Sequence, residues 1–265
     1  MPNIERPGAS IHYEVYGSGP ALVVAHGAGG NRISWWQQIP HFSRRYRVIA
    51  IDHRGFGASR CEPDAFRPAH FPDDLAAVLD AEGVSRAGLV CQSMGGWSGL
   101  PFALRHPSRV ACLVLCSTPG GLWNDAIAAS VRATPARIAA AKIDHTPALG
   151  AAFARKSPEM RHLYDQIGSL NQASLGWLGR LFEPEARIAP AALAGYRVPT
   201  LVIAGSDDLL FPQAAMRAVA RDIPGAEFTL FDGAGHSTYF EMPARFNQVV
   251  GDFVARHLPG ADAPA

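Results

Sequence analysis

The sequence contains no long apolar run, and its first residues carry no targeting signal. No stretch approaches the roughly 18 uninterrupted apolar residues that a membrane-spanning helix needs, so we expect no transmembrane segment. Residues 1–8 lack the apolar core of a signal peptide. These two absences exclude the common membrane and secretory signals, and we therefore expect a cytoplasmic protein.

Charge of one sign is also missing. The 24 lysines and arginines nearly balance the 23 acidic residues, and the basic residues are scattered along the chain. A nucleic-acid interface would need a basic stripe, so we expect no nucleic-acid partner and no membrane surface. The four cysteines form no Cys-x-x-Cys pair and have no zinc-like histidine spacing. Cys91, Cys112 and Cys116 lie inside or at the ends of apolar runs, and we expect these three to be small buried residues in a reducing compartment.

What the chain does have is alternation of short apolar runs with helical patterns. Strands are predicted at Ile11–Tyr16, Ala21–Ala25, Arg47–Ile51, Ala87–Cys91 and Val110–Cys116. Helices are predicted between them, around Trp35, Trp36 and Ile39, at Pro72–Glu82 and at Met94–His106. This alternation is typical of an α/β fold, with a mostly parallel central sheet and helices on both faces.

The alternation stops between residues 120 and 190, where apolar residues recur only with helical spacing. Strands return at Thr200–Ala204 and Glu227–Phe231, with helices at Pro212–Ile223 and Pro243–Leu258. A stretch of about seventy residues is too long for an ordinary loop. We therefore predict a core formed by residues 1–119 and 191–265, with residues 120–190 inserted as a helical cap or lid. The alternative is a packing appendage that does not contact substrate.

A candidate nucleophile lies where a predicted strand meets a predicted helix. Ser93 occupies this turn, and Gly95 supplies the small residue that such a crowded turn requires two positions later. Two positions earlier Cys91 stands where glycine is usual. The helix that begins at Met94 directs its N-terminal dipole at the same point, which favours an oxyanion.

A serine hydroxyl needs a base, and the base needs a carboxylate. His236 follows a predicted strand in a loop of small residues, so its imidazole can reach the sheet edge. Asp207 and Asp208 follow another strand, at the edge where parallel sheets place their chemistry. We choose Asp208 as the partner of the histidine and expect Asp207 to bond locally in the turn.

The order Ser, Asp, His, each after an apolar strand, is the chain order of α/β-hydrolases. The chain resembles this superfamily over nearly its whole length, in the capped branch of serine esterases, lactonases and carbon–carbon bond hydrolases. Residues 26–30 (His-Gly-Ala-Gly-Gly) resemble the family's His-Gly loop, residues 52–59 its next turn, and residues 205–208 its acid loop. The resemblance implies the α/β-hydrolase fold, and an oxyanion hole formed by the backbone N–H groups of Ala28 and Met94.

The predicted function is hydrolysis of a small apolar or aromatic ester, with Ser93, Asp208 and His236 as the catalytic triad and without a metal or organic cofactor. A lactonase or a carbon–carbon bond hydrolase acting on a β-diketone would use the same triad. A ligand-binding, receptor-like protein with little turnover is the alternative from another class. The expected partner is a small-molecule substrate, and the chain is expected to be a monomer or a homodimer.

Eight aromatic residues are the candidates for the substrate pocket, and they suggest an apolar or aromatic acyl or alcohol group. They are Trp35, Trp97, Trp123, Phe153, Tyr164, Trp177, Phe182 and Tyr239. Of these, Trp97 is expected to be buried on the helix behind the serine turn.

Overall fold

A single sheet forms the centre of the computed structural model, which describes residues 2–173 and 175–258. Within this part of the chain the strands lie in the order β1-β2-β4-β3-β6-β7-β8-β9, and β5 pairs with β2. Their bounds are β1 (Asn3–Arg6), β2 (Ala9–Tyr16), β3 (Ala21–Ala25), β4 (Arg47–Ile51), β5 (Arg60–Cys61), β6 (Ala87–Gln92), β7 (Val110–Cys116), β8 (Thr200–Gly205) and β9 (Glu227–Phe231). From β4 to β9 every pairing is parallel, whereas β1, β2 and β5 pair antiparallel.

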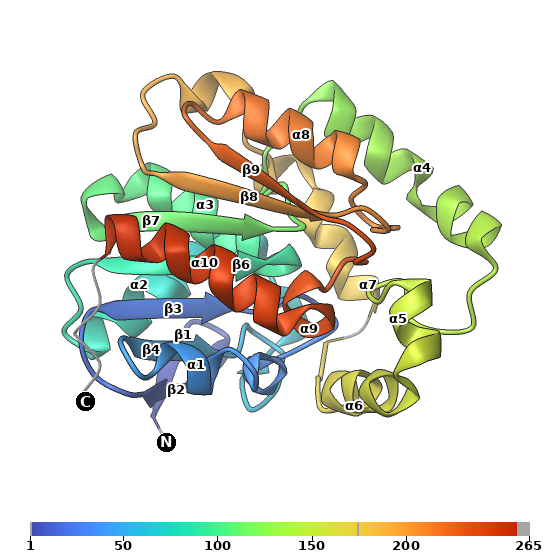
Figure 1. The fold of residues 1–265 in the computed structure, drawn as a ribbon. Helices are drawn as coiled ribbons and strands as arrows, with labels where there is room; N and C mark the ends of the chain where they lie inside the picture. Colours follow the sequence, from blue (N-terminus) through green and yellow to red (C-terminus); the bar gives the residue numbers. More distant parts are fainter. Residues whose placement is uncertain (1, 174, 259–265) are drawn as a thin grey trace.

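Two groups of helices cover the two faces of the sheet (Figure 1). On one face α2 (Phe71–Ala81), α3 (Gly96–Arg105) and α8 (Gln213–Asp222) pack on residues such as Val23 and Leu89. On the other face α1 (Ile39–Phe42) and α10 (Pro243–His257) pack on Val24 and Val90. Strands β3, β6 and β7 are buried along their whole length, because both of their faces are covered.

Local sequence explains where the helices begin and end. Helix α2 has Pro72 in its first turn with two aspartates, and it stops before Gly83, whose φ is +64°. Helix α4 (Asp125–Ala141) begins after Asn124, whose side chain accepts a hydrogen bond from the Ile127 N–H at 2.8 Å.

Between β7 and β8 the chain leaves the sheet and forms a helical layer beyond its carboxyl edge (Figure 1). This layer contains α4, α5 (Ala151–Lys156), α6 (Pro158–Ser169) and α7 (Leu175–Leu178). Its two ends come together at an isolated bridge between Leu122 and Ile188. The domain limits at 120 and 190 remain a prediction. No helix of the described ranges is long and apolar enough to cross a membrane.

The α/β architecture expected from the sequence is confirmed, and the strands at Ala21–Ala25, Arg47–Ile51, Val110–Cys116 and Glu227–Phe231 have the predicted bounds. The helix expected around Trp35 was wrong: this segment is a 3-10 turn at Arg32–Trp35, followed by the separate short helix α1. Strands β1 and β5 were not predicted, because short edge strands carry little apolar periodicity.

Candidate active site

Ser93 lies in a strained turn between β6 and α3. Its φ is +48°, a region that residues with a side chain rarely adopt. The surrounding backbone approaches closely: a Cβ added to Gly95 would lie 2.3 Å from the Ala25 carbonyl oxygen, and one added to Gly27 would lie 2.7 Å from the Ser93 Cβ. Glycine is therefore required at both positions, and the turn presents Ser93 at the carboxyl edge of the sheet.

Cys91 replaces the usual glycine of this turn, and the structure shows how it is accommodated. Its thiol packs against α3 at Gly99, where an added Cβ would lie 2.5 Å from the Cys91 Sγ. Burial raises the pKa of the Cys91 thiol, which keeps it neutral. The glycine on the helix thus supplies the space that the turn itself lacks.

Asp208 and His236 form a buried pair at the same edge. The Asp208 Oδ2 lies 2.9 Å from the His236 Nδ1, and both side chains are almost fully buried. The Asp208 Oδ1 accepts hydrogen bonds from the backbone N–H groups of Leu210 at 2.7 Å and Phe211 at 2.9 Å. These bonds fix the carboxylate, which in turn orients the imidazole.

Parallel strands bring the three predicted triad residues to one edge. Strand β6 ends just before Ser93, β8 ends three residues before Asp208, and β9 ends five residues before His236. The amide of Gln92 donates to the His236 carbonyl at 3.3 Å, which ties the serine turn to the histidine loop. Asp207 is exposed, and its Oδ1 accepts a hydrogen bond from the Ser206 hydroxyl, a local turn contact.

A buried carboxylate that sequence reasoning missed supports the histidine loop. Glu241 on α9 (Thr238–Glu241) accepts hydrogen bonds from the N–H groups of Gly235 at 2.8 Å and Ser237 at 3.3 Å, on either side of His236. It also accepts one from Gly150, at the start of α5, at 3.2 Å. Burial raises the pKa of Glu241 to about 7, although these N–H groups oppose the rise. The sequence signal that could have identified Glu241 is an acidic residue in a short segment of otherwise uncharged, mostly aromatic residues.

The loop that carries Ala28 lies beside the serine turn. The His26 Nε2 accepts a hydrogen bond from the His53 N–H at 3.0 Å, so its Nδ1 donates to the Gly27 carbonyl at 2.8 Å. Burial lowers the pKa of His26, which keeps the ring neutral and the loop fixed. Ala28 lines the cavity at Ser93, whereas the Met94 side chain is buried beneath the turn. The oxyanion-hole assignment to their backbone N–H groups stays a prediction.

A cavity of about 290 Å³ opens onto Ser93. Apolar residues from the core and from the helical layer form most of its wall. The lining residues are Ala28, Ser93, Trp97, Val131, Thr134, Pro135, Leu178, Leu181, Phe182, Leu210 and Phe211. Within the described ranges, this lining contains no charged side chain.

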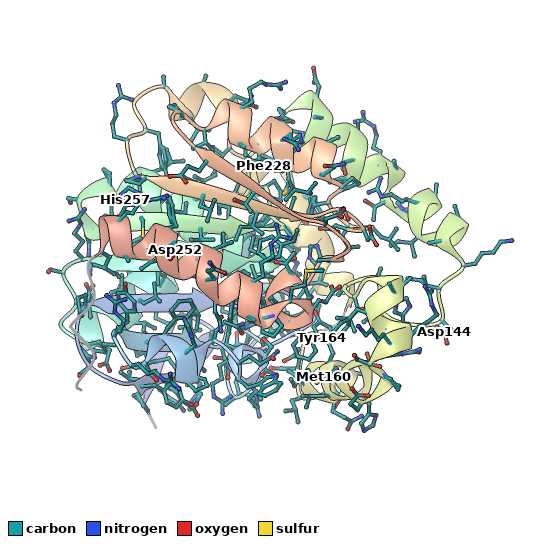
Figure 2. All side chains as sticks on the ribbon, viewed as in Figure 1. Asp144, Met160, Tyr164, Phe228, Asp252 and His257 are labelled. Atoms are coloured by element: carbon teal, nitrogen blue, oxygen red, sulfur yellow. The ribbon has the colours of Figure 1, made fainter. Side chains whose placement is uncertain are left out.

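Six aromatic residues predicted for the pocket are not among the residues that line this cavity, and their contact with substrate stays a prediction. Trp35 and Tyr239 are fully buried and pack on each other, with ring centres 4.4 Å apart, in the core beneath α10. Phe153 packs against Phe240. Tyr164 on α6 lies beside α9 (Figure 2), and its hydroxyl is 3.0 Å from the Oγ of Ser237, the residue just before α9.

The other two belong to the inner surface of the helical layer. Trp123 lies under the Arg187 guanidinium, and Trp177 packs against Phe66. Helical spacing in the sequence shows that these aromatic side chains face inward. It does not show whether they reach the core or the cavity. Trp97 and Phe182 are the two of the eight candidates that line the cavity, and Trp97 is also buried on α3 as expected.

Within residues 2–173 and 175–258, no group of three His, Cys, Asp or Glu side chains is placed to hold a metal ion. The cysteines at positions 61, 91, 112 and 116 are free and buried.

Comparison with known proteins places this geometry in context. A family model described as the alpha/beta hydrolase fold matches residues 20–243. The chain is 33% identical over 274 residues to the "Putative carbamate hydrolase RutD" of Variovorax paradoxus (strain S110), which covers 96% of this chain and 99% of that protein. It is 32% identical over 277 residues to the 2-hydroxymuconate semialdehyde hydrolase of Pseudomonas sp. (strain CF600), with 94% and 90% covered.

Among solved structures, Est816, described as an N-acyl homoserine lactone degrading enzyme, is similar with a TM-score of 0.79 and 30% sequence identity. The match covers 96% of this chain and all of that one. The relatives therefore share one fold while their names indicate different substrates.

Proposed function

The chain belongs to the α/β-hydrolase fold family and is a hydrolase, and on that premise we propose that it cleaves a small, neutral, apolar ester through Ser93, His236 and Asp208. One observation carries the proposal: an apolar cavity opens onto a serine in a strained strand-to-helix turn, at the sheet edge that also holds the Asp208–His236 pair. A serine, a histidine–carboxylate pair and an apolar cavity at one sheet edge support acyl transfer from an apolar ester.

The proposed mechanism has two steps. The Ser93 hydroxyl attacks the ester carbonyl while His236 accepts its proton, and Asp208 stabilises the imidazolium that forms. The backbone N–H groups of Ala28 and Met94 donate to the tetrahedral oxyanion, which is stabilised further by the N-terminal end of the following helix. His236 then protonates the leaving alcohol, and water activated by the same histidine releases the acid from the acyl-enzyme.

The cavity supports a neutral substrate over a charged one. Its described lining offers apolar carbon and the Thr134 hydroxyl, which already donates to the Ser130 carbonyl at 2.9 Å. An ionised group would lose its hydration there without gaining an opposite charge, which is costly. A lactone is the second candidate, because it is neutral and because the similar Est816 is described as an N-acyl homoserine lactone degrading enzyme.

A carbon–carbon bond hydrolase would use the same three residues, and a receptor-like protein would use the cavity without turnover. We further propose a cytoplasmic location, which the four free and buried cysteines support. The proposed partner is a small molecule, with neither nucleic acid nor membrane, and the proposed state is a monomer or a homodimer.

The test compares wild type with Ser93→Ala, using a fluorophosphonate probe together with p-nitrophenyl acetate and butyrate. We expect covalent labelling at Ser93, and a loss of roughly 10⁴- to 10⁶-fold in kcat in the variant. A fully active Ser93→Ala variant would refute the nucleophile. Labelling without ester or lactone turnover would instead favour the carbon–carbon hydrolase, if a diketone is cleaved, or the receptor-like protein, if none is.

A further inference from the structure

A second cavity, of about 300 Å³, shares one lining residue with the cavity at Ser93. It is formed between α3 and the segment that returns from the helical layer to the core. Its wall is apolar at Pro101, Leu104 and Ile188, and it carries the exposed charged residues Arg105, Glu185 and Arg187. The second cavity is therefore apolar on its inner wall and polar where it meets solvent.

Trp97 lies on the wall of both cavities. Among the described residues it is the one that lines both of them, and its side chain is only 3% exposed. Its ring packs edge-on against Phe182, which lines the cavity at Ser93, with ring centres 5.8 Å apart. Trp97 comes four residues after Ser93, in the first turn of α3.

Packing alone holds the indole in this position. Its Nε1 is buried and makes no hydrogen bond to any residue in the described part of the chain. A smaller side chain at this position would therefore leave no buried hydrogen-bond partner unpaired.

We propose that Trp97 is a specificity-determining residue that limits the length of the acyl group, and that the second cavity is an acyl extension closed off by its indole. This inference rests on the proposed ester hydrolysis at Ser93. In the wild type, an acyl chain that fills the first cavity meets the indole, and each further methylene group must be left unburied or displace the ring. With the indole removed, added methylene groups would be buried against Pro101, Leu104 and Ile188.

The experiment measures kcat/KM for p-nitrophenyl esters from acetate to dodecanoate, expressed in each variant relative to butyrate. Trp97→Ala is expected to move the optimum to longer chains, with about a fourfold gain for each methylene newly buried and a gain of at least tenfold for decanoate. Trp97→Phe, which preserves most of the wall, should give a smaller shift in the same direction. If Trp97→Ala proves unfolded by thermal melting, the shift in Trp97→Phe decides the question.

Leu104 supplies the matched control, because it lines the second cavity but not the first. Leu104→Trp alone should leave the chain-length profile unchanged, since the intact Trp97 separates it from the substrate. Combined with Trp97→Ala, it should fill the second cavity again and restore the short-chain preference.

An unchanged profile in a folded Trp97→Ala variant that still labels with fluorophosphonate would overturn this inference and leave the proposed function standing. A Trp97→Ala/Leu104→Trp double variant that keeps the long-chain preference would overturn the extension into the second cavity. Absence of both labelling and ester turnover in the wild type would instead be a failure of the proposed function itself.

Discussion

At Ser93 the backbone is held in a conformation that ordinary residues avoid, and its neighbours make this possible. Gly95 and Gly27 leave room for the close approach of the surrounding chain, and Gly99 leaves room for the Cys91 thiol. A left-handed residue with a side chain costs roughly 1–2 kcal/mol. Packing on both faces of β6 offsets this free-energy cost. The strained turn therefore persists and holds the Ser93 hydroxyl at the sheet edge.

Single substitutions test which of the adjacent residues Asp207 and Asp208 is the partner of His236. Asp208→Asn should lower kcat by about 10⁴-fold, because an amide cannot stabilise an imidazolium and can favour the wrong histidine tautomer. Ester turnover and labelling by the fluorophosphonate probe measure this loss. Asp207→Asn is the matched control: this side chain is exposed and should change kcat by less than about twofold. A severe loss in Asp207→Asn with little loss in Asp208→Asn would reverse the assignment.

The raised pKa of Glu241 predicts that the free energy of unfolding depends on pH. Burial raises its pKa from 4.5 to about 7, so between these values the folded protein binds a proton that the unfolded chain has released. The stabilisation is therefore fully present below pH 4.5 and is lost as the pH rises through 7. Its size is about 3 kcal/mol in the free energy of unfolding.

Glu241→Gln isolates this contribution, because glutamine does not titrate. The free energy of unfolding of the wild type minus that of the variant should fall by about 3 kcal/mol between pH 4.5 and pH 8. Urea unfolding at several pH values measures it. Taking the difference removes the opposite contribution of His26 and His53, whose pKa values burial lowers. A difference that is constant with pH would contradict the prediction.

At the scale of elements, side chains tie the helical layer to the loops that carry the triad. Arg137 on α4 donates to the carbonyls of Leu209 at 2.8 Å and Leu210 at 3.2 Å, next to Asp208. Glu241 binds the N–H at the start of α5 together with the histidine loop. The helical layer is thus connected to the acid loop and to the histidine loop, and these contacts hold the cavity wall in place.

Removal of the Arg137 contact should loosen α4 over the cavity. Arg137→Ala is expected to lower the free energy of unfolding by about 1.5–3 kcal/mol, the usual contribution of hydrogen bonds from a charged group. It should also lower kcat/KM several-fold, because Thr134 and Leu210 line the cavity on either side of this contact. Thermal unfolding and p-nitrophenyl butyrate turnover measure the two effects.

Arg132 lies on the same helix and is exposed, so Arg132→Ala is the matched control, with less than about 0.5 kcal/mol of change expected. Equal effects of the two substitutions would mean that the Arg137 contact has no special role.

For the whole molecule, burial predicts an order of stability. Strands β3, β6 and β7 are fully buried, whereas α4 is largely exposed along its length. Native-state hydrogen exchange should therefore be slowest in these strands, where exchange requires global unfolding, and at least about tenfold faster in α4. Mass spectrometry of peptic fragments resolves the two regions. Equal protection in α4 and β6 would show that the helical layer opens only with the core.

The sequence by itself determined the features that depend on neighbours along the chain. Continuous apolar runs such as Ala21–Ala25 are suited only to strands covered on both faces, so their bounds could be predicted. The serine turn, the acid loop and the histidine loop each have local signals in small residues after a strand. Their order along the chain then indicated the family, which the comparisons establish. Assignment of the triad roles remains a prediction until Ser93 is tested.

Only the tertiary structure decided which side chains meet across the molecule. Trp35, which ends a 3-10 turn, and Trp97, in the first turn of α3, are both buried tryptophans. One lies in the core beneath α10, whereas the other lines two cavities. Glu241 likewise gained its role from the N–H groups of two distant loops. The physical reason is that helical spacing shows that a side chain faces inward, whereas the surface it meets depends on how non-local elements pack.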